Sequence, residues 1–112
     1  MNKHKKRILI DLDGVINDYN GNYDETIIPP LKNGAENFIK ILHKKYELYL
    51  FTSRNLLLSA KWLIENNIDK YFTDITNVKI PAYLYIDDRT INFKGDFETA
   101  LNEIIEFKPY WK

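Results

Sequence analysis

The sequence predicts an α/β fold built on a mainly parallel sheet, and two observations support this. Short apolar runs rich in β-branched residues alternate along the chain with longer segments whose apolar residues recur at helical spacing. Strands that alternate with helices form βαβ units, in which the strands are parallel and the helices cover both faces of the sheet. A chain of 112 residues is expected to form one domain over 1–112.

Each element is expected for a local reason. The run Ile8-Leu9-Ile10 is apolar at every position, which is typical of a strand buried on both faces. Asn33 and Asn55 each precede apolar residues at helical spacing, so both are candidate N-caps. The expected strands are 7–12, 47–51, a short one within 72–78, and 83–86, with room for a short fifth near 91–93. The expected helices are 34–45, 56–67 and 97–107.

Three segments have a specific expected role. In the last helix, four apolar residues at helical spacing are expected to pack on the sheet: Phe97, Leu101, Ile104 and Ile105. The aromatic segment 107–111 is expected to dock on the core, and Trp111, like Trp62, is interpreted as a packing residue. Residues 13–22 are rich in Gly, Asn and Asp and are expected to form a loop.

The composition excludes several classes of protein. The 16 Lys and Arg residues balance 16 Asp and Glu residues, so a broad basic surface for long nucleic acid is not expected. The chain has no Cys, which excludes disulfide scaffolds, thiolate zinc sites and cysteine catalysis. No apolar run reaches the ~18 residues of a membrane span and no secretory signal pattern is present, so we expect a cytoplasmic protein without a membrane partner.

Carboxylates and hydroxyls stand at the ends of three predicted strands. They are, in chain order, Asp11 and Asp13, Thr52 and Ser53, and Asp87 and Asp88. In an open α/β sheet, ligands bind outside the carboxyl ends of the strands. Segments far apart in the sequence are therefore expected to bring these groups, together with Lys79 after the third strand, to one candidate site.

Such a cluster suits phosphoryl transfer assisted by a hard cation. Crowded carboxylates raise one another's pKa, and a divalent cation relieves their repulsion. Oxygen ligands without His or Cys favour Mg²⁺, which also accepts substrate phosphate. One Asp can then attack phosphorus, and a second Asp two residues on can protonate the leaving oxygen and later activate water. Thr, Ser and Lys side chains can bind the oxygens over which transition-state charge spreads.

The same segments resemble the motifs of a known family. Ile8-Leu9-Ile10 followed by Asp11-Leu12-Asp13-Gly14-Val15 resembles the first motif of the haloacid dehalogenase (HAD) superfamily. Three further segments resemble its second, third and fourth motifs: Leu50-Phe51-Thr52-Ser53-Arg54, Lys79 with Pro81, and Tyr85-Ile86-Asp87-Asp88. The resemblance spans residues 7 to about 95.

The resemblance implies a Rossmann-like three-layer α/β/α sandwich that hydrolyses phosphomonoesters with Mg²⁺ through an aspartyl-phosphate. It implies that Asp11 is the nucleophile and a metal ligand. It implies that Asp13 is the general acid and base and binds the metal through its main-chain carbonyl. Lys79 would orient the nucleophile. An acid at position 13 fits the phosphatases of the superfamily rather than its dehalogenases.

The resemblance also implies roles for the remaining motif residues. Thr52 would bind the phosphoryl group, with Ser53 as its replacement if the strand ends one residue later, and Arg54 beside them could contact a second anionic group. Asp87 and Asp88 would hold Mg²⁺, one of them through water.

Two spacings qualify the resemblance. Only seven residues separate Lys79 from Asp87, too few for the helix that many members place there, so Lys94 is an alternative site lysine. The intervals from Asp13 to Thr52 and from Thr52 to Lys79 are filled by expected elements, which leaves no room for a cap domain. The chain therefore resembles the capless members, which act on large substrates or are covered by a neighbouring subunit, and a homo-oligomer fits this interpretation.

The substrate class stays open at this point. The zero net charge favours a small phosphorylated molecule over long nucleic acid, but a nucleotide, a sugar phosphate and a polynucleotide end all fit. Arg89 could contact a second anionic group, and Tyr19 and Tyr23 either stack on a base or sugar or pack within the loop. The alternative function is a catalytically silent HAD-like binding or regulatory protein. A two-component receiver domain fits less well, because Thr52 precedes the second acidic pair.

Overall fold

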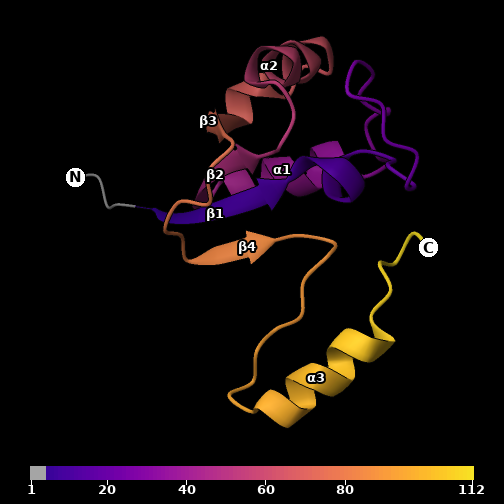
Figure 1. Ribbon diagram of the computed structural model, residues 1–112. Coiled ribbons are helices and arrows are strands. Elements are labelled where there is room, and N and C mark those ends of the chain that lie inside the picture. The colour runs from indigo at the N-terminus through magenta and orange to yellow at the C-terminus, as the bar shows by residue number, and fades with distance from the viewer. Residues whose placement is uncertain (1–4) are drawn as a thin grey trace.

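The computed structural model describes residues 5–112, and within them four strands and three helices form (Figure 1). The strands are β1 (Lys6–Asp11), β2 (Tyr46–Phe51), β3 (Phe72–Thr76) and β4 (Leu84–Ile86), and the helices are α1 (Ala35–His43), α2 (Leu56–Glu65) and α3 (Phe97–Glu106). Short helical turns cover Leu12–Ile16 and Asp69–Tyr71. Within residues 5–112, no helix has the length and apolar character needed to cross a membrane.

The four strands form one parallel sheet in the order β3-β2-β1-β4. The predicted parallel α/β fold is therefore confirmed. Ile8 of β1 lies between Leu48 of β2 and Leu84 of β4. The chain steps in one direction from β1 to β2 to β3, and right-handed crossovers then place α1 and α2 on the same face of the sheet.

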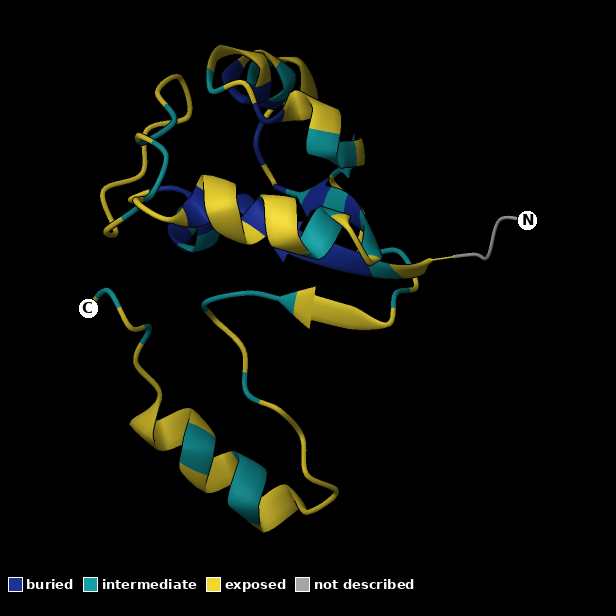
Figure 2. Ribbon diagram, turned by 180° about the vertical axis from the view of Figure 1, so that it is seen from behind, coloured by how far each residue is buried: buried dark blue, intermediate teal, exposed yellow. Residues whose placement is uncertain are grey.

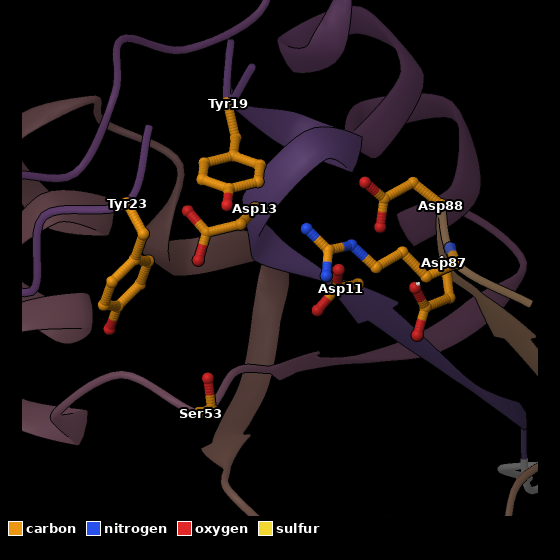
Figure 3. Close-up of a pocket in the computed structure, with 8 residues that line it drawn as sticks. Asp11, Asp13, Tyr19, Tyr23, Ser53, Asp87 and Asp88 are labelled. Carbon is orange, nitrogen blue, oxygen red and sulfur yellow. Dashed lines mark hydrogen bonds between the residues drawn. The ribbon is translucent and has the colours of Figure 1, made fainter. Parts of the chain in front are cut away.

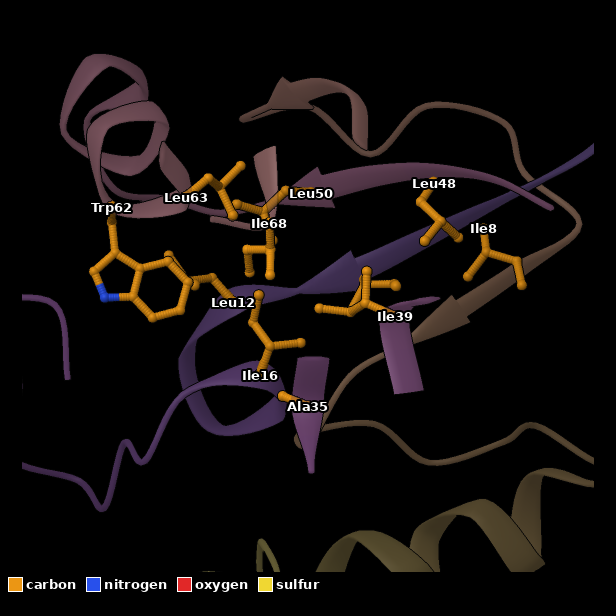
Figure 4. Packing of buried hydrophobic residues seen from close by; sticks show 11 residues of the cluster. Ile8, Leu12, Ile16, Ala35, Ile39, Leu48, Leu50, Trp62, Leu63 and Ile68 are labelled. Carbon is orange, nitrogen blue, oxygen red and sulfur yellow. The ribbon is translucent and has the colours of Figure 1, made fainter. Parts of the chain in front are cut away.

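The core fills the space between that face and the two helices (Figure 4). Alternate residues of β1 and β2 point into it, as the period of two along a strand requires. Ile39 of α1 and Leu63 of α2 meet them, and each is almost fully buried. The cluster consists of Ile8, Ile10, Leu12, Ile16, Ala35, Ile39, Leu48, Leu50, Trp62, Leu63 and Ile68. The interpretation of Trp62 as a packing residue is confirmed.

The opposite face of the sheet differs from the expectation. The segment 77–83 that returns from β3 to β4 contains no helix, as the short spacing before Asp87 predicts. The last helix forms as predicted, but α3 has no buried residue and lies away from the sheet (Figure 2). The expectation that its apolar stripe packs on the sheet, giving a third layer, is therefore wrong for this structure.

Several element ends are also corrected. Asn55 caps α2 as predicted, because its side chain accepts a hydrogen bond from the backbone N–H of Leu58 at 2.9 Å. Asn33 does not cap α1, whose N-cap is Gly34 with a φ of 89°. The short third strand expected within 72–78 forms over Phe72–Thr76, and Asn77 directly after it donates through Nδ2 to the carbonyls of Thr52 and Arg54. Residues 91–93 form no fifth strand.

Candidate active site

A cleft of about 260 Å³ opens at the carboxyl ends of the strands, between β1 and β4 (Figure 3). At this point the strand order reverses, since β2 and β3 lie on one side of β1 and β4 on the other. Open α/β sheets bind their ligands at such reversal points, because the two diverging loops leave a crevice. The cleft is lined by Asp11, Asp13, Tyr19, Tyr23, Ser53, Asp87, Asp88 and Arg89.

Three carboxylates form the acidic part of the cleft. Asp11 ends β1, and Asp87 and Asp88 follow β4, so the parallel pairing of these strands brings them together. One oxygen from each carboxylate lies within 4.8 Å of the other two. Burial, followed by the charges of Asp87, Asp88 and Asp13, raises the pKa of Asp11 to about 8. This all-oxygen donor set fits a hard divalent cation, whose charge would offset the repulsion.

The side chain of Asp13 is held from two directions. Its two oxygens lie 3.1 and 2.9 Å from Nε of Arg54, and Nδ2 of Asn17 donates to Oδ1 at 3.0 Å. Asn17 is fully buried, and its own Oδ1 accepts hydrogen bonds from the backbone N–H groups of Gly14 and Tyr19. The loop after β1 is thereby folded around Asn17, which orients Asp13 toward the cleft.

Arg54 supports Asp13 instead of contacting solvent. Its side chain is completely buried, Nη1 donates to the carbonyl of Asp24 at 2.7 Å, and the guanidinium lies 4.5 Å from the ring centroid of Tyr23. Nη2 is buried, and no group within residues 5–112 accepts a hydrogen bond from it. The sequence-based suggestion that Arg54 contacts a second anionic group does not fit this burial, whereas Arg89 is exposed and lines the cleft.

The two hydroxyls after β2 occupy different positions. Thr52 is buried, and its Oγ1 accepts a hydrogen bond from the backbone N–H of Arg54 at 3.0 Å. Ser53 is exposed and lines the cleft. Thr76 accepts a hydrogen bond from the backbone N–H of Thr52, which continues the sheet pairing by one residue. Of the two candidates for binding a phosphoryl group, Ser53 therefore has the accessible hydroxyl.

The two candidate lysines also differ in position. Lys79 borders a smaller cavity of about 60 Å³ that it shares with Asp11 and Asp87, and its Nζ lies 4.5 Å from the ring centroid of Tyr85. Lys94 lies in the segment before α3, where its Nζ pairs with Glu103 at 2.8 Å. The structure brings Lys79 near the carboxylates and does not bring Lys94 there.

The segment after α3 reaches the cleft, which the sequence does not predict. The hydroxyl of Tyr110 donates to the carbonyl of Gly14 at 2.6 Å, and Nε1 of Trp111 donates to Oδ2 of Asp88. Tyr110 and Trp111 therefore dock on the loop after β1 and on a carboxylate of the cleft, and the expectation that segment 107–111 docks on the core is corrected. Trp111 packs against Tyr19, as expected of a packing residue, and in addition donates to Asp88.

Sequence reasoning missed the roles of Asn17 and Trp111. The position of Asn17 four residues after Asp13, in a glycine-containing loop, is a usable signal because Asn side chains commonly organise turns. For Trp111 the sequence carries no comparable signal, since the contact joins residues 23 positions apart in the chain through an irregular segment.

The assembled site places the oxygen donors that a hard cation prefers beside the carboxylate of Asp13. The paired arrangement of Asp11 and Asp13 offers one group for attack and one for proton transfer, with Ser53 and Arg89 available for an anionic substrate. No family model, curated protein or solved structure matches this chain.

Proposed function

We propose that the protein is a capless, HAD-type hydrolase that cleaves phosphomonoesters with the help of Mg²⁺ and an aspartyl-phosphate on Asp11. The observation that carries the proposal is the convergence of Asp11, Asp13, Asp87 and Asp88 in one cleft at the strand reversal point. Asp11 ends β1 and Asp13 lies two residues on, while Asp87 and Asp88 directly follow β4, so the pairing of these two strands brings the four carboxylates together.

The first step would be an attack by a carboxylate oxygen of Asp11 on phosphorus. A bond forms from that oxygen to phosphorus, and the bond from phosphorus to the substrate oxygen breaks. Asp13 donates a proton to the leaving oxygen, which departs as an alcohol. Arg54 and Asn17 hold the Asp13 side chain in one orientation at the edge of the cleft, where it can reach a leaving oxygen.

The second step would return the enzyme to its starting state. Asp13 takes a proton from a water molecule, and the resulting hydroxide attacks phosphorus. The bond between phosphorus and the Asp11 oxygen breaks, which releases inorganic phosphate and the free carboxylate. The candidate donors to the phosphoryl oxygens are Ser53, which lines the cleft, and Lys79, which borders the smaller cavity beside Asp11 and Asp87.

Asp11, Asp87 and Asp88 are the residues that would hold Mg²⁺. When bound, the cation would neutralise negative charge on the phosphoryl group and on the carboxylates. The raised pKa of Asp11, about 8, supports a need for a cation, because a protonated carboxyl is a poor nucleophile at neutral pH.

The decisive experiment compares two isosteric substitutions. Asp11→Asn removes the proposed nucleophile, while Asp69→Asn changes an exposed carboxylate in the turn before β3 and serves as the control. We expect Asp11→Asn to lower phosphatase turnover at least roughly 10³-fold, by analogy with the loss of other catalytic nucleophiles, while the control retains wild-type turnover.

The screen should cover nucleotides, sugar phosphates and phosphorylated oligonucleotide ends, each with Mg²⁺ and with EDTA. Turnover of Asp11→Asn within tenfold of wild type would contradict the proposal. Binding of Mg²⁺ without hydrolysis of any substrate would favour a catalytically silent binding protein.

A further inference from the structure

We propose that Trp111 is a positioning residue for Asp88, whose carboxylate it fixes for binding of the cation. This inference deepens the proposed function and rests on it. Its basis is the hydrogen bond from Nε1 of Trp111 to Oδ2 of Asp88, one of the three clustered carboxylates. A carboxylate has two oxygens, so one can accept from the indole while the other remains for a cation.

The indole is held in place by the loop after β1. Its ring lies 5.2 Å from that of Tyr19, with the two planes at 79°, an edge-to-face arrangement. The guanidinium of Arg89 lies 5.3 Å from the indole centroid. Contacts with Tyr19 and Arg89 therefore hold the ring whose N–H reaches Asp88.

Two glycines make room for this ring. A Cβ on Gly14 would lie 2.9 Å from Nε1 of Trp111 and 2.1 Å from Oδ2 of Asp88. A Cβ on Gly21 would lie 3.2 Å from Cζ3 of the indole. The hydrogen bond between Trp111 and Asp88 thus lies directly against the backbone of the loop that carries Asp13.

The residue before Trp111 supplies an independent anchor. The hydroxyl of Tyr110 donates to the carbonyl of Gly14, and Nζ of Lys32 lies 5.2 Å from the Tyr110 ring centroid. Both side chains of the segment therefore contact the same loop, although α3 itself is not packed.

A hydrogen bond to a ligating carboxylate fixes its rotamer and keeps its oxygen aimed at the metal. Loss of such outer contacts typically weakens metal affinity about 10–100-fold. Asp88 follows β4 in an irregular segment, where no regular backbone pairing would hold it otherwise. Trp111 would supply the missing constraint.

The test measures Mg²⁺ affinity on the full chain by isothermal titration calorimetry, with MgCl₂ alone and no substrate. Trp111→Phe keeps an aromatic ring and removes the N–H, so we expect it to weaken Mg²⁺ binding about 10-fold or more. Asp88→Asn and the double variant complete a thermodynamic cycle. In the Asp88→Asn background, Trp111→Phe should change the affinity less than twofold, because its partner is already altered.

A second substitution covers the case in which Trp111→Phe does not fold. Tyr110→Phe removes one hydroxyl that anchors the same segment, and it should weaken Mg²⁺ binding in the same direction and by less. Unchanged or tighter Mg²⁺ binding by the folded variants would overturn the proposal, and tighter binding would show that the indole competes with the cation. The proposal would also be overturned if Trp111→Phe weakened Mg²⁺ binding equally in the wild-type and the Asp88→Asn backgrounds. The substitution would then act through folding in general and not through Asp88.

The two proposals fail in different ways. If wild-type protein binds Mg²⁺ and hydrolyses phosphomonoesters while Trp111→Phe matches it in both, only the role of Trp111 is wrong. If wild type binds Mg²⁺ and the cycle behaves as expected but no phosphomonoester is cleaved, only the phosphatase function is wrong. Absence of Mg²⁺ binding by wild type would overturn both.

Discussion

Helices α1 and α3 have similar length and pattern but different surroundings. α1 has 9 residues and α3 has 10, and each carries an apolar stripe opposite a polar face. α1 buries Ala35 and Ile39 against the sheet, whereas α3 buries no residue, and its Ile105 is 81% exposed. The difference shows that an apolar stripe predicts a helix but does not ensure that the fold supplies a surface to cover it.

The topology explains why the two helices differ. α1 connects two adjacent parallel strands, so a right-handed crossover necessarily lays it on the sheet. α3 follows β4, the edge strand, and is joined to it by residues 87–96, which form no regular element. Isolated helices of this length are marginal in water, so α1 draws its stability from packing, and α3 depends on its local contacts.

The sharpest test of this comparison makes the same truncation in both helices. Ile39→Ala removes a side chain with 0% exposure, and we expect a loss of about 2–5 kcal/mol in the free energy of unfolding. Ile105→Ala makes the identical change on α3 and should alter stability by less than about 0.5 kcal/mol. Urea denaturation followed by circular dichroism measures both. A loss above 1 kcal/mol for Ile105→Ala would mean that α3 is packed in solution.

The second prediction concerns how the stability of the packed sheet region depends on pH. It involves Asp11, the last residue of β1. Folding raises the pKa of Asp11 from 3.8 to about 8, so the folded protein holds this proton more tightly than the unfolded chain. Its contribution to stability is therefore fully present below about pH 4 and is lost as the pH rises through about 8.

Asp11→Asn removes this titration. We expect the variant to match wild type near pH 4 and to exceed its stability by on the order of a few kcal/mol at pH 9. Adding Mg²⁺ should restore wild-type stability at pH 9 and leave the variant unchanged. Thermal melts across the pH range measure the effect, and parallel curves for the two proteins would show that Asp11 ionises normally.

The third prediction separates close contact from backbone strain at two glycines. Gly14 has a φ of 83° and lies against Asp88, while Gly34 has a φ of 89° and no atom within 4 Å of an added Cβ. Both Ala substitutions incur a left-handed backbone cost of about 1–2 kcal/mol. Gly14→Ala should cost more than Gly34→Ala by about 1–3 kcal/mol, because overpacking adds to the strain. Equal losses in denaturation experiments would mean that the loop moves freely away from Asp88.

Much of the fold can be predicted from the sequence because it depends on local signals. Apolar runs and helical periodicity identify the four strands and three longer helices of residues 5–112, and the N-cap at Asn55 is found from its residue type alone. The short helical turns over Leu12–Ile16, where a loop is expected, and over Asp69–Tyr71 are not predicted. The packing of α3 could not be predicted, because its apolar stripe is equally compatible with a covered and an uncovered helix. The sequence predicts Asn33 as the N-cap of α1, but the N-cap is Gly34, which has a left-handed backbone. That conformation depends on how the preceding loop approaches α1, and residue type alone does not predict it.

The candidate site also has residues whose place can be predicted from the sequence and residues whose place cannot. Asp11 ends a strand, and Ser53 and Asp87 lie just after two others. The order of these strands along the sheet is set by topology, so the convergence of the three residues can be predicted from the sequence. Arg54 lies in the same motif, yet its burial against Asp13 depends on the path of the loop after β1. Trp111 reaches Asp88 through an irregular segment, and no periodic pattern encodes such a contact.

The smallest effect is expected at the N-caps of α2 and α3. In both, a side-chain oxygen of the N-cap residue accepts a hydrogen bond from a backbone N–H of the first turn. Asn55 accepts a hydrogen bond from the N–H of Leu58 at the start of the packed α2, and Asp96 accepts one from Thr99 at the start of α3. Asn55→Ala should lower global stability by about 1 kcal/mol, because α2 unfolds only together with the core.

Asp96→Ala should leave the midpoint of global unfolding unchanged and lower only the helical signal and the exchange protection of α3 amides. Hydrogen bonds from Thr99 lower the pKa of Asp96, so its carboxylate form stabilises the α3 cap, and acidification through that pKa should reproduce the substitution. Hydrogen exchange followed by NMR resolves the two helices. A shift of the global unfolding midpoint by Asp96→Ala would show that α3 unfolds together with the core. α1 and α3 would then differ in where they lie relative to the sheet but not in when they unfold.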